Sequence, residues 1–86
     1  MILAADLAAA FLRETGCELR QRELLGRTML IPEDDRFGSF GIIFGRLDDS
    51  APLQFRTRTY PNGVLLVLWG GAKEKKLDDV LRRICG

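Results

Sequence analysis

The sequence of 86 residues contains no histidine. Histidine is the most common general base, the usual partner of serine and cysteine nucleophiles, and a frequent ligand of zinc and iron. Its absence removes the familiar nucleophile pairs and most transition-metal sites. We therefore expect a protein that is not an enzyme and that needs no metal or other cofactor.

Cysteine is almost as scarce. Cys17 and Cys85 are the only two, and they are far apart and form no CxxC pair. Two cysteines alone do not complete a structural zinc site. Because no secretion signal precedes them, we expect reduced thiols rather than a disulfide.

Long hydrophobic runs are also missing. No apolar run approaches the roughly 20 residues that span a bilayer. The apolar start, residues 1–7, includes Asp6 and lacks the basic leader of a signal peptide. The hydrophobic content of 47% and the charged content of 29% are those of a globular chain. We expect one soluble, cytoplasmic domain that covers residues 1–86.

The net charge of +1 excludes a general attraction to nucleic acid or membranes. The charges are nevertheless unevenly distributed. Residues 33–49 contain five acids against two bases, a balance of −3, whereas residues 50–86 contain seven bases against three acids, a balance of +4. The acidic middle and the basic C-terminal part could attract each other within one chain or between two chains.

Amphipathic helices are predicted at the two ends of the chain. Apolar residues recur every fourth position in residues 3–15, and at the i, i+3, i+4, i+7 spacing in residues 72–85. Thr15-Gly16 is a typical helix stop. The apolar positions are Leu3, Leu7 and Phe11 in the first helix, and Leu77, Val80, Leu81 and Ile84 in the second.

The run Val64–Trp69 has six consecutive apolar residues between a Pro-Asn-Gly turn and a Gly-Gly break. Such a short run predicts a central strand that is covered on both faces. Residues 53–60 alternate in character and should form a hairpin with this run. Residues 37–47 predict another strand, interrupted by glycines.

Residues 17–31 allow two interpretations. The alternation of Arg20 and Arg22 with their neighbours favours an extended segment from Leu19 to Ile31, bent near Gly26 and closed by Pro32. The helix-forming residues in the first half of the segment allow a short second helix instead.

Together these segments predict a single α+β domain with an N-terminal helix, a mostly antiparallel sheet of three or four strands, and a C-terminal helix. We expect both helices to pack on one face of the sheet. The central strand then needs cover on its second face. In so short a chain a second copy is the simplest cover, so we expect a homodimer joined partly through the sheet.

The best candidate for a contact surface is one side of the segment 53–60, where two guanidiniums and a phenol repeat at every second position. These groups suit phosphate contact and base stacking, or an acidic protein partner. The same pattern also serves to keep one face of a sheet wet. The candidate residues, with the basic residues that could lie beside them, are Arg46, Arg56, Arg58, Tyr60, Lys73, Lys75 and Lys76.

The sequence thus predicts a small non-enzymatic binding or accessory protein that acts through protein–protein interaction as a homodimer. The first alternative is a nucleic-acid-binding protein that uses Arg56, Arg58 and Tyr60. The second is a small enzyme that uses acidic loop residues, for which Asp34-Asp35 and Asp48-Asp49 are the available pairs.

Overall fold

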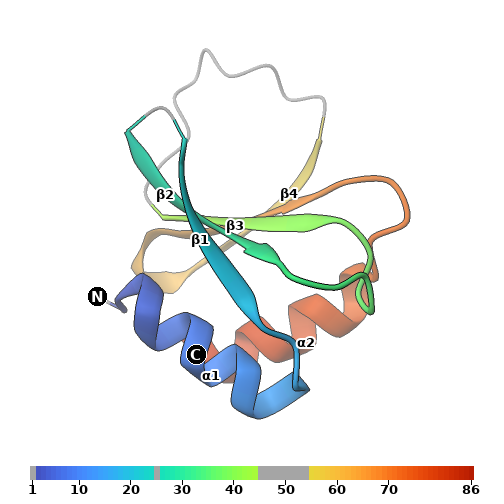
Figure 1. Cartoon of the computed structure of the whole chain (residues 1–86), viewed down its shortest axis with the longest axis horizontal. Helices are drawn as coiled ribbons and strands as arrows, with labels where there is room; N and C mark the ends of the chain where they lie inside the picture. Colours follow the sequence, from blue (N-terminus) through green and yellow to red (C-terminus); the bar gives the residue numbers. More distant parts are fainter. Residues whose placement is uncertain (1, 25, 45–54) are drawn as a thin grey trace.

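A computed structural model describes residues 2–24, 26–44 and 55–86. In this part of the chain, two helices lie on one side of a five-stranded antiparallel sheet, so the protein is α+β as predicted (Figure 1). The elements are α1 (Ala4–Thr15), β1 (Leu19–Leu24), β2 (Arg27–Pro32), β3 (Phe40–Phe44), β4 (Arg56–Tyr60), β5 (Val64–Leu68) and α2 (Glu74–Cys85).

The strands are arranged in the order β1-β2-β3-β5-β4, and each neighbouring pair is antiparallel. The centre of the sheet is therefore β3, whereas β5 lies between β3 and β4. This corrects the expectation that the apolar run Val64–Trp69 is the central strand. The two edges of the sheet are β1 and β4, and each has a helix on the same side of the sheet (Figure 1).

The expected count of three or four strands was wrong because residues 19–31 form two strands rather than one bent segment. The chain reverses next to Gly26, whose φ of 75° is a left-handed conformation that glycine adopts without strain. As a result β1 and β2 pair along their whole length, from Leu19↔Pro32 to Leu24↔Arg27. The described residues of this segment, 19–24 and 26–31, contain no helix, so the alternative of a short second helix was wrong there.

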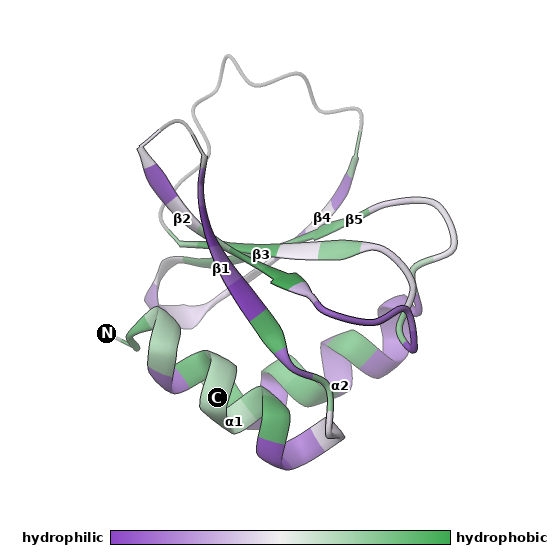
Figure 2. Ribbon diagram, viewed as in Figure 1, coloured by the Kyte–Doolittle hydropathy of each residue, from purple (hydrophilic) through white to green (hydrophobic). Residues whose placement is uncertain are grey.

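The helix-side core fills the space between the sheet and the two helices. The buried side chains of α1 and α2 meet those of all the strands except β4 there, and Figure 2 shows the contrast between the hydrophobic inner strand β3 and the mostly hydrophilic edge strand β1. The cluster consists of Leu7, Phe11, Cys17, Leu19, Leu30, Phe40, Ile42, Val64, Leu66, Leu68, Leu77, Val80 and Leu81.

The start of α2 is fixed by the loop that precedes β3. The backbone N–H of Lys73 donates to the carbonyl of Phe37 at 2.9 Å. Gly38, in the same loop, packs closely on the segment that leads into α2. A Cβ at the position of Gly38 would lie 2.8 Å from Cα of Ala72. Because this loop sets where α2 begins, it also sets how α2 lies against the sheet.

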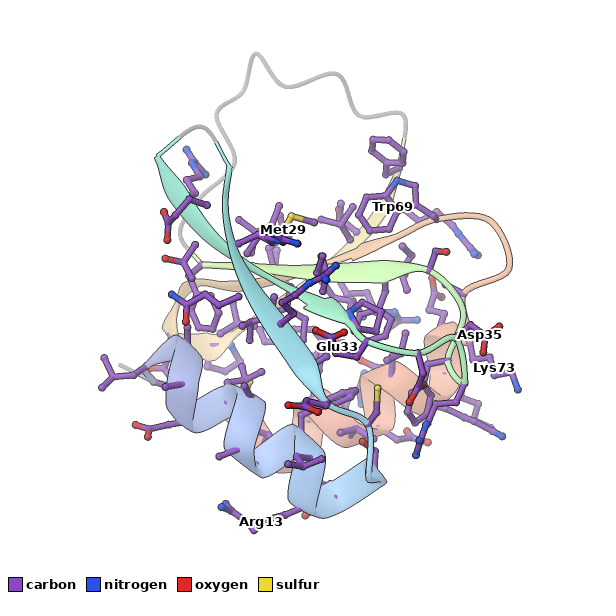
Figure 3. All side chains as sticks on the ribbon, viewed as in Figure 1. Arg13, Met29, Glu33, Asp35, Trp69 and Lys73 are labelled. Atoms are coloured by element: carbon purple, nitrogen blue, oxygen red, sulfur yellow. The ribbon has the colours of Figure 1, made fainter. Side chains whose placement is uncertain are left out.

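The second face of the sheet, away from the helices, has a smaller apolar cluster. Ile43, Leu65 and Val67 are only 8%, 7% and 5% exposed, and Met29 and Trp69 pack against them (Figure 3). These three side chains are thus covered without a second chain, so the homodimer stays a prediction and loses the reason given for it. No helix in the described ranges is both long and apolar enough to cross a membrane.

Candidate binding site at the β4 edge

The alternation predicted for β4 is present, and it places the candidate residues on the helix side of the sheet. Arg58 lies opposite Leu66, and Tyr60 lies opposite Val64; both β5 residues belong to the helix-side core. Opposite residues of an antiparallel pair project to the same face. Arg56, Arg58 and Tyr60 therefore project toward α2 rather than away from the helices.

Helix α2 meets these side chains with a row of charged residues spaced four apart, Glu74, Asp78 and Arg82. Nη2 of Arg58 lies 3.2 Å from Oε2 of Glu74, and its Nη1 lies 3.5 Å from Oδ2 of Asp78. Arg56 approaches Glu74 less closely, with Nη1 3.7 Å from Oε1. Arg58 thus bridges two successive turns of the helix.

Asp78 connects both elements. Its Oδ1 accepts a hydrogen bond from the Tyr60 hydroxyl at 2.7 Å, and its Oδ2 lies 3.0 Å from Nε of Arg82. The hydrogen bond from Tyr60, with the charges of Arg58 and Arg82, lowers the pKa of Asp78 below its ordinary value. Burial and the bond to Asp78 raise the pKa of Tyr60. Asp78 is therefore ionised and Tyr60 protonated at neutral pH.

The negative groups of this network are buried more deeply than the positive ones. The side chains of Asp78 and Glu74 are 12% and 27% exposed, whereas those of Arg56 and Arg82 are 65% and 68% exposed. Three arginines share two carboxylates, which leaves a balance of +1. The solvent-facing part of this network is therefore formed by guanidinium groups.

The hydrogen-bond pattern shows which backbone groups of β4 face outward. The N–H of Trp69 donates to the carbonyl of Ser39, so the odd-numbered residues of β5 bond to β3. The backbone groups of successive strand residues alternate in direction, and the even-numbered residues of β5 consequently bond to β4. Their partners are Arg56, Arg58 and Tyr60. The N–H and C=O groups of Thr57 and Thr59 must then point to the open edge.

A groove with a volume of about 710 Å³ runs along this edge. Residues 57–61 line one side, and Asp78, Arg82 and Gly86 line the other. The groove thus combines outward-facing backbone groups of a strand with a charged helix face. No strand of the described residues occupies it.

The predicted lysines do not join this site as a group. Lys73, Lys75 and Lys76 are exposed, and Lys73 lies at the start of α2 (Figure 3). Lys76 lines a different groove, of about 270 Å³, together with Glu14 of α1. Arg46 lies outside the described residues.

Of the acidic pairs considered for an enzyme, only Asp34-Asp35 lies within the described residues. Asp34 is held by Arg36, with Oδ2 2.9 Å from Nη2, and the hydrogen bonds from Arg36 lower the pKa of Asp34. Asp48 and Asp49 lie outside the described residues. Among the described residues, no three or more Cys, Asp or Glu side chains gather where they could hold a metal ion.

Comparisons with known protein families, curated proteins and solved structures find no match. The sequence pattern pointed to Arg56, Arg58 and Tyr60, which the structure brings together beside α2, but it did not point to Glu74, Asp78 or the edge position of β4. The spacing of Glu74, Asp78 and Arg82 at every fourth position was a signal for a charged stripe on α2, since it matches one face of a helix.

Proposed function

We propose that the protein is a small binding module that acts through protein–protein contact and accepts an extended segment of a partner protein along β4. The observation that carries the proposal is the outward direction of the Thr57 and Thr59 backbone groups, which line an open groove. An extended peptide that adds a strand to a sheet edge gains affinity from main-chain hydrogen bonds, and pockets beside the edge add specificity.

Two features of β4 keep this edge suitable for pairing. Natural sheets often block an edge with proline, a bulge or charges that project over it. Residues 56–60 contain no proline, and the arginines of β4 are drawn toward α2 by Glu74 and Asp78. Threonine, the residue at both outward positions, is favoured in strands because its branched side chain packs well on a pleated surface.

A partner segment suits this edge better than a second copy of β4. Two copies that pair through Thr57 and Thr59 can be centred on Thr57, Arg58 or Thr59. The first two registers place Arg56 opposite Arg58, or Arg58 opposite itself, and like charges in directly opposite positions are destabilising. The third places Thr57 opposite Pro61, which has no N–H to donate to the other strand. A segment of another sequence avoids this repulsion.

Nucleic acid is the second candidate ligand for the same arginines, as the sequence suggested. Glu74 and Asp78 already neutralise much of the positive charge of Arg56, Arg58 and Arg82. A surface with a balance of only +1 offers little counterion release, which is the main source of affinity for phosphate backbones. The proposal therefore favours a polypeptide.

The test is a display selection of random twelve-residue peptides on the full chain, followed by binding measurements on variants. The double variant Thr57→Pro, Thr59→Pro removes the two outward N–H groups without removing a bond between β4 and β5. The double variant Thr57→Val, Thr59→Val keeps both N–H groups. Gln21→Pro makes the same kind of change at the β1 edge. The N–H of Glu33 donates to the carbonyl of Glu18, so the even-numbered residues of β1 bond to β2. The N–H of Gln21 consequently points outward.

We expect the selected peptides to lose binding to the proline double variant, by at least about tenfold for two main-chain hydrogen bonds. They should bind the valine double variant and Gln21→Pro as they bind the native chain. Selected peptides that bind the proline double variant equally well would overturn the proposal, as would a selection that enriches nothing. Salt-dependent binding of DNA or RNA that needs Arg56 and Arg58 would assign the site to nucleic acid instead.

A further inference from the structure

We infer that the segment accepted along β4 is acidic at every second position, and that Arg56 and Arg82 select these acidic side chains. This inference rests on the proposed function and adds the chemistry of the partner. It follows from where the side chains of an added strand would lie and from which charges they would meet there.

The register of an added strand fixes the direction of its side chains. Residues opposite Thr57 and Thr59 project to the second face of the sheet, as the threonines do opposite Val67 and Leu65. Residues opposite Arg58 project to the helix side. Every second side chain of the partner therefore lies in the groove between β4 and α2.

On the helix side these side chains meet positive charge. Arg82 approaches Asp78 through Nε at 3.0 Å, while 68% of its side chain stays exposed. A guanidinium group has five N–H donors, so one carboxylate does not satisfy it. Arg56 is similarly open, since it shares Glu74 with Arg58 and is 65% exposed. Arg56 approaches Glu74 in the first turn of α2, whereas Arg82 lies two helical turns further on, about 12 Å away. Two partner carboxylates at separate helix-side positions would therefore meet one guanidinium each.

The part of the groove around Asp78 is unsuited to a basic side chain, because exposed guanidiniums surround this carboxylate. Asp78 has already used Oδ1 for Tyr60 and Oδ2 for Arg58 and Arg82. A lysine of the partner would have to approach the exposed guanidiniums before it could reach this carboxylate. Discrimination against basic segments thus comes from repulsion as well as from the loss of an attractive contact.

Three labelled decapeptides provide the probe: threonine alternating with glutamate, with glutamine or with lysine. Their binding is measured by fluorescence anisotropy at about 50 mM salt, where exposed charges are only partly screened. We expect the glutamate peptide to bind about tenfold more tightly than the glutamine peptide, as two exposed charge contacts allow. The lysine peptide should bind most weakly.

Two double variants isolate the selecting arginines. Arg56→Gln with Arg82→Gln should abolish the preference for glutamate over glutamine while leaving the glutamine peptide bound. Arg20→Gln with Arg22→Gln makes the same charge change on the β1 edge and should leave the preference intact. Circular dichroism of each variant establishes that the fold is retained.

The outcomes separate this inference from the proposed function. Equal binding of the three peptides, lost in the proline double variant of β4, would overturn the acidic preference and leave strand addition in place. A preference for glutamate that survives loss of Arg56 and Arg82 would also overturn the inference, as would a glutamate peptide that does not bind. Glutamate-peptide binding that is unaffected by the β4 prolines would count against strand addition itself.

Discussion

At the scale of single residues, Asp78 is the group on which the β4–α2 contact depends. Asp78 accepts a hydrogen bond from the Tyr60 hydroxyl of β4, and it forms ion pairs with Arg58 of β4 and with Arg82 of its own helix. Its neighbour Asp79 is exposed and lies on the side of α2 that faces α1. Two adjacent carboxylates of one helix thus differ in environment, which makes them a natural pair for comparison.

We expect the stability contributed by Asp78 to depend on pH. Its pKa in the folded chain lies below the ordinary value of 3.8, chiefly because Tyr60 donates to the charged form. As the pH falls, Asp78 therefore takes up its proton at a higher pH in the unfolded chain than in the folded chain. The stability from ionised Asp78 is present above pH 3.8 and is lost as the pH falls through the lowered pKa of the folded chain. Asp78→Asn should lower the free energy of unfolding at pH 7. The difference in free energy of unfolding between this variant and the native chain should become smaller in acid.

Urea denaturation between pH 7 and pH 2 measures this difference. Asp79→Asn is the matched control, and it should affect stability much less at neutral pH. A difference between the native chain and Asp78→Asn that stays constant down to pH 2 would contradict the assigned hydrogen bonds.

Two glycines with the same backbone conformation should respond differently to alanine. Gly38 and Gly26 have φ values of 77° and 75°. Alanine in this conformation costs about 1–2 kcal/mol at either position. At Gly38 the added methyl group also collides with the backbone of Gly71 and Ala72, which adds about 1–3 kcal/mol of overpacking, whereas at Gly26 no atom of the described residues lies within 4 Å.

Thermal or urea denaturation of the two variants measures the contrast. Gly38→Ala should be the less stable variant because its neighbours are backbone atoms that cannot rotate away. Equal losses of stability would show that the loop before β3 does not hold the start of α2 as closely as described.

At the scale of elements, the periodic segments were predictable and their arrangement was not. The stripe of α2 and the unbroken run of β5 are local patterns, and each formed near its expected position. The β1–β2 hairpin was missed because the sequence between its two strands, Leu-Gly, lacks the Asn-Gly or Asp-Gly pair that marks a two-residue hairpin turn. A single glycine in an otherwise extended segment predicts a bend equally well.

The candidate site was predictable only in part for a related reason. The alternation along β4 shows that Arg56, Arg58 and Tyr60 share a face, but which face depends on the order of strands. That order places β5 between β3 and β4 and is decided by contacts distant in sequence. Whether Arg58 meets solvent or Glu74 is likewise set by where α2 lies on the sheet.

Hydrogen exchange should reveal the two sets of backbone groups in β4. Amides of Arg56, Arg58 and Tyr60 bond to β5, and they should exchange at least about a hundredfold more slowly than those of Thr57 and Thr59. Nuclear magnetic resonance of the free chain resolves these amides individually. Slow exchange of Thr57 and Thr59 in the free chain would mean that the edge is already paired.

At the scale of the whole molecule, the two faces of the sheet leave room for separate contacts. The β4 groove lies on the helix side of the sheet. On the second face, Phe55 is 44% exposed and lies beside Trp69, with a ring-centroid distance of 5.4 Å. We propose that the predicted homodimer uses this second face, where Phe55 offers an exposed aromatic ring beside Trp69. The like-charge registers of β4 make its edge a poor self-association surface.

Light scattering at micromolar concentration tests this assignment. A dimer has twice the chain mass of 9.7 kDa, and we expect Phe55→Ser to reduce the measured mass to that of one chain. Thr57→Pro with Thr59→Pro should leave the dimer unchanged. A single-chain mass for the native protein would contradict the homodimer, and a dimer dispersed by the prolines would assign the β4 edge to a second copy.

The alternating direction of backbone groups in β4 has a consequence for how a partner would be found by sequence. Affinity from main-chain bonds does not depend on side chains, and the side chains over the second face lie opposite Thr57 and Thr59 rather than opposite the arginines. Selection would then constrain a partner at every other residue and leave the intervening ones free to diverge. Partners would share a short, spaced pattern of acids rather than a recognisable sequence family.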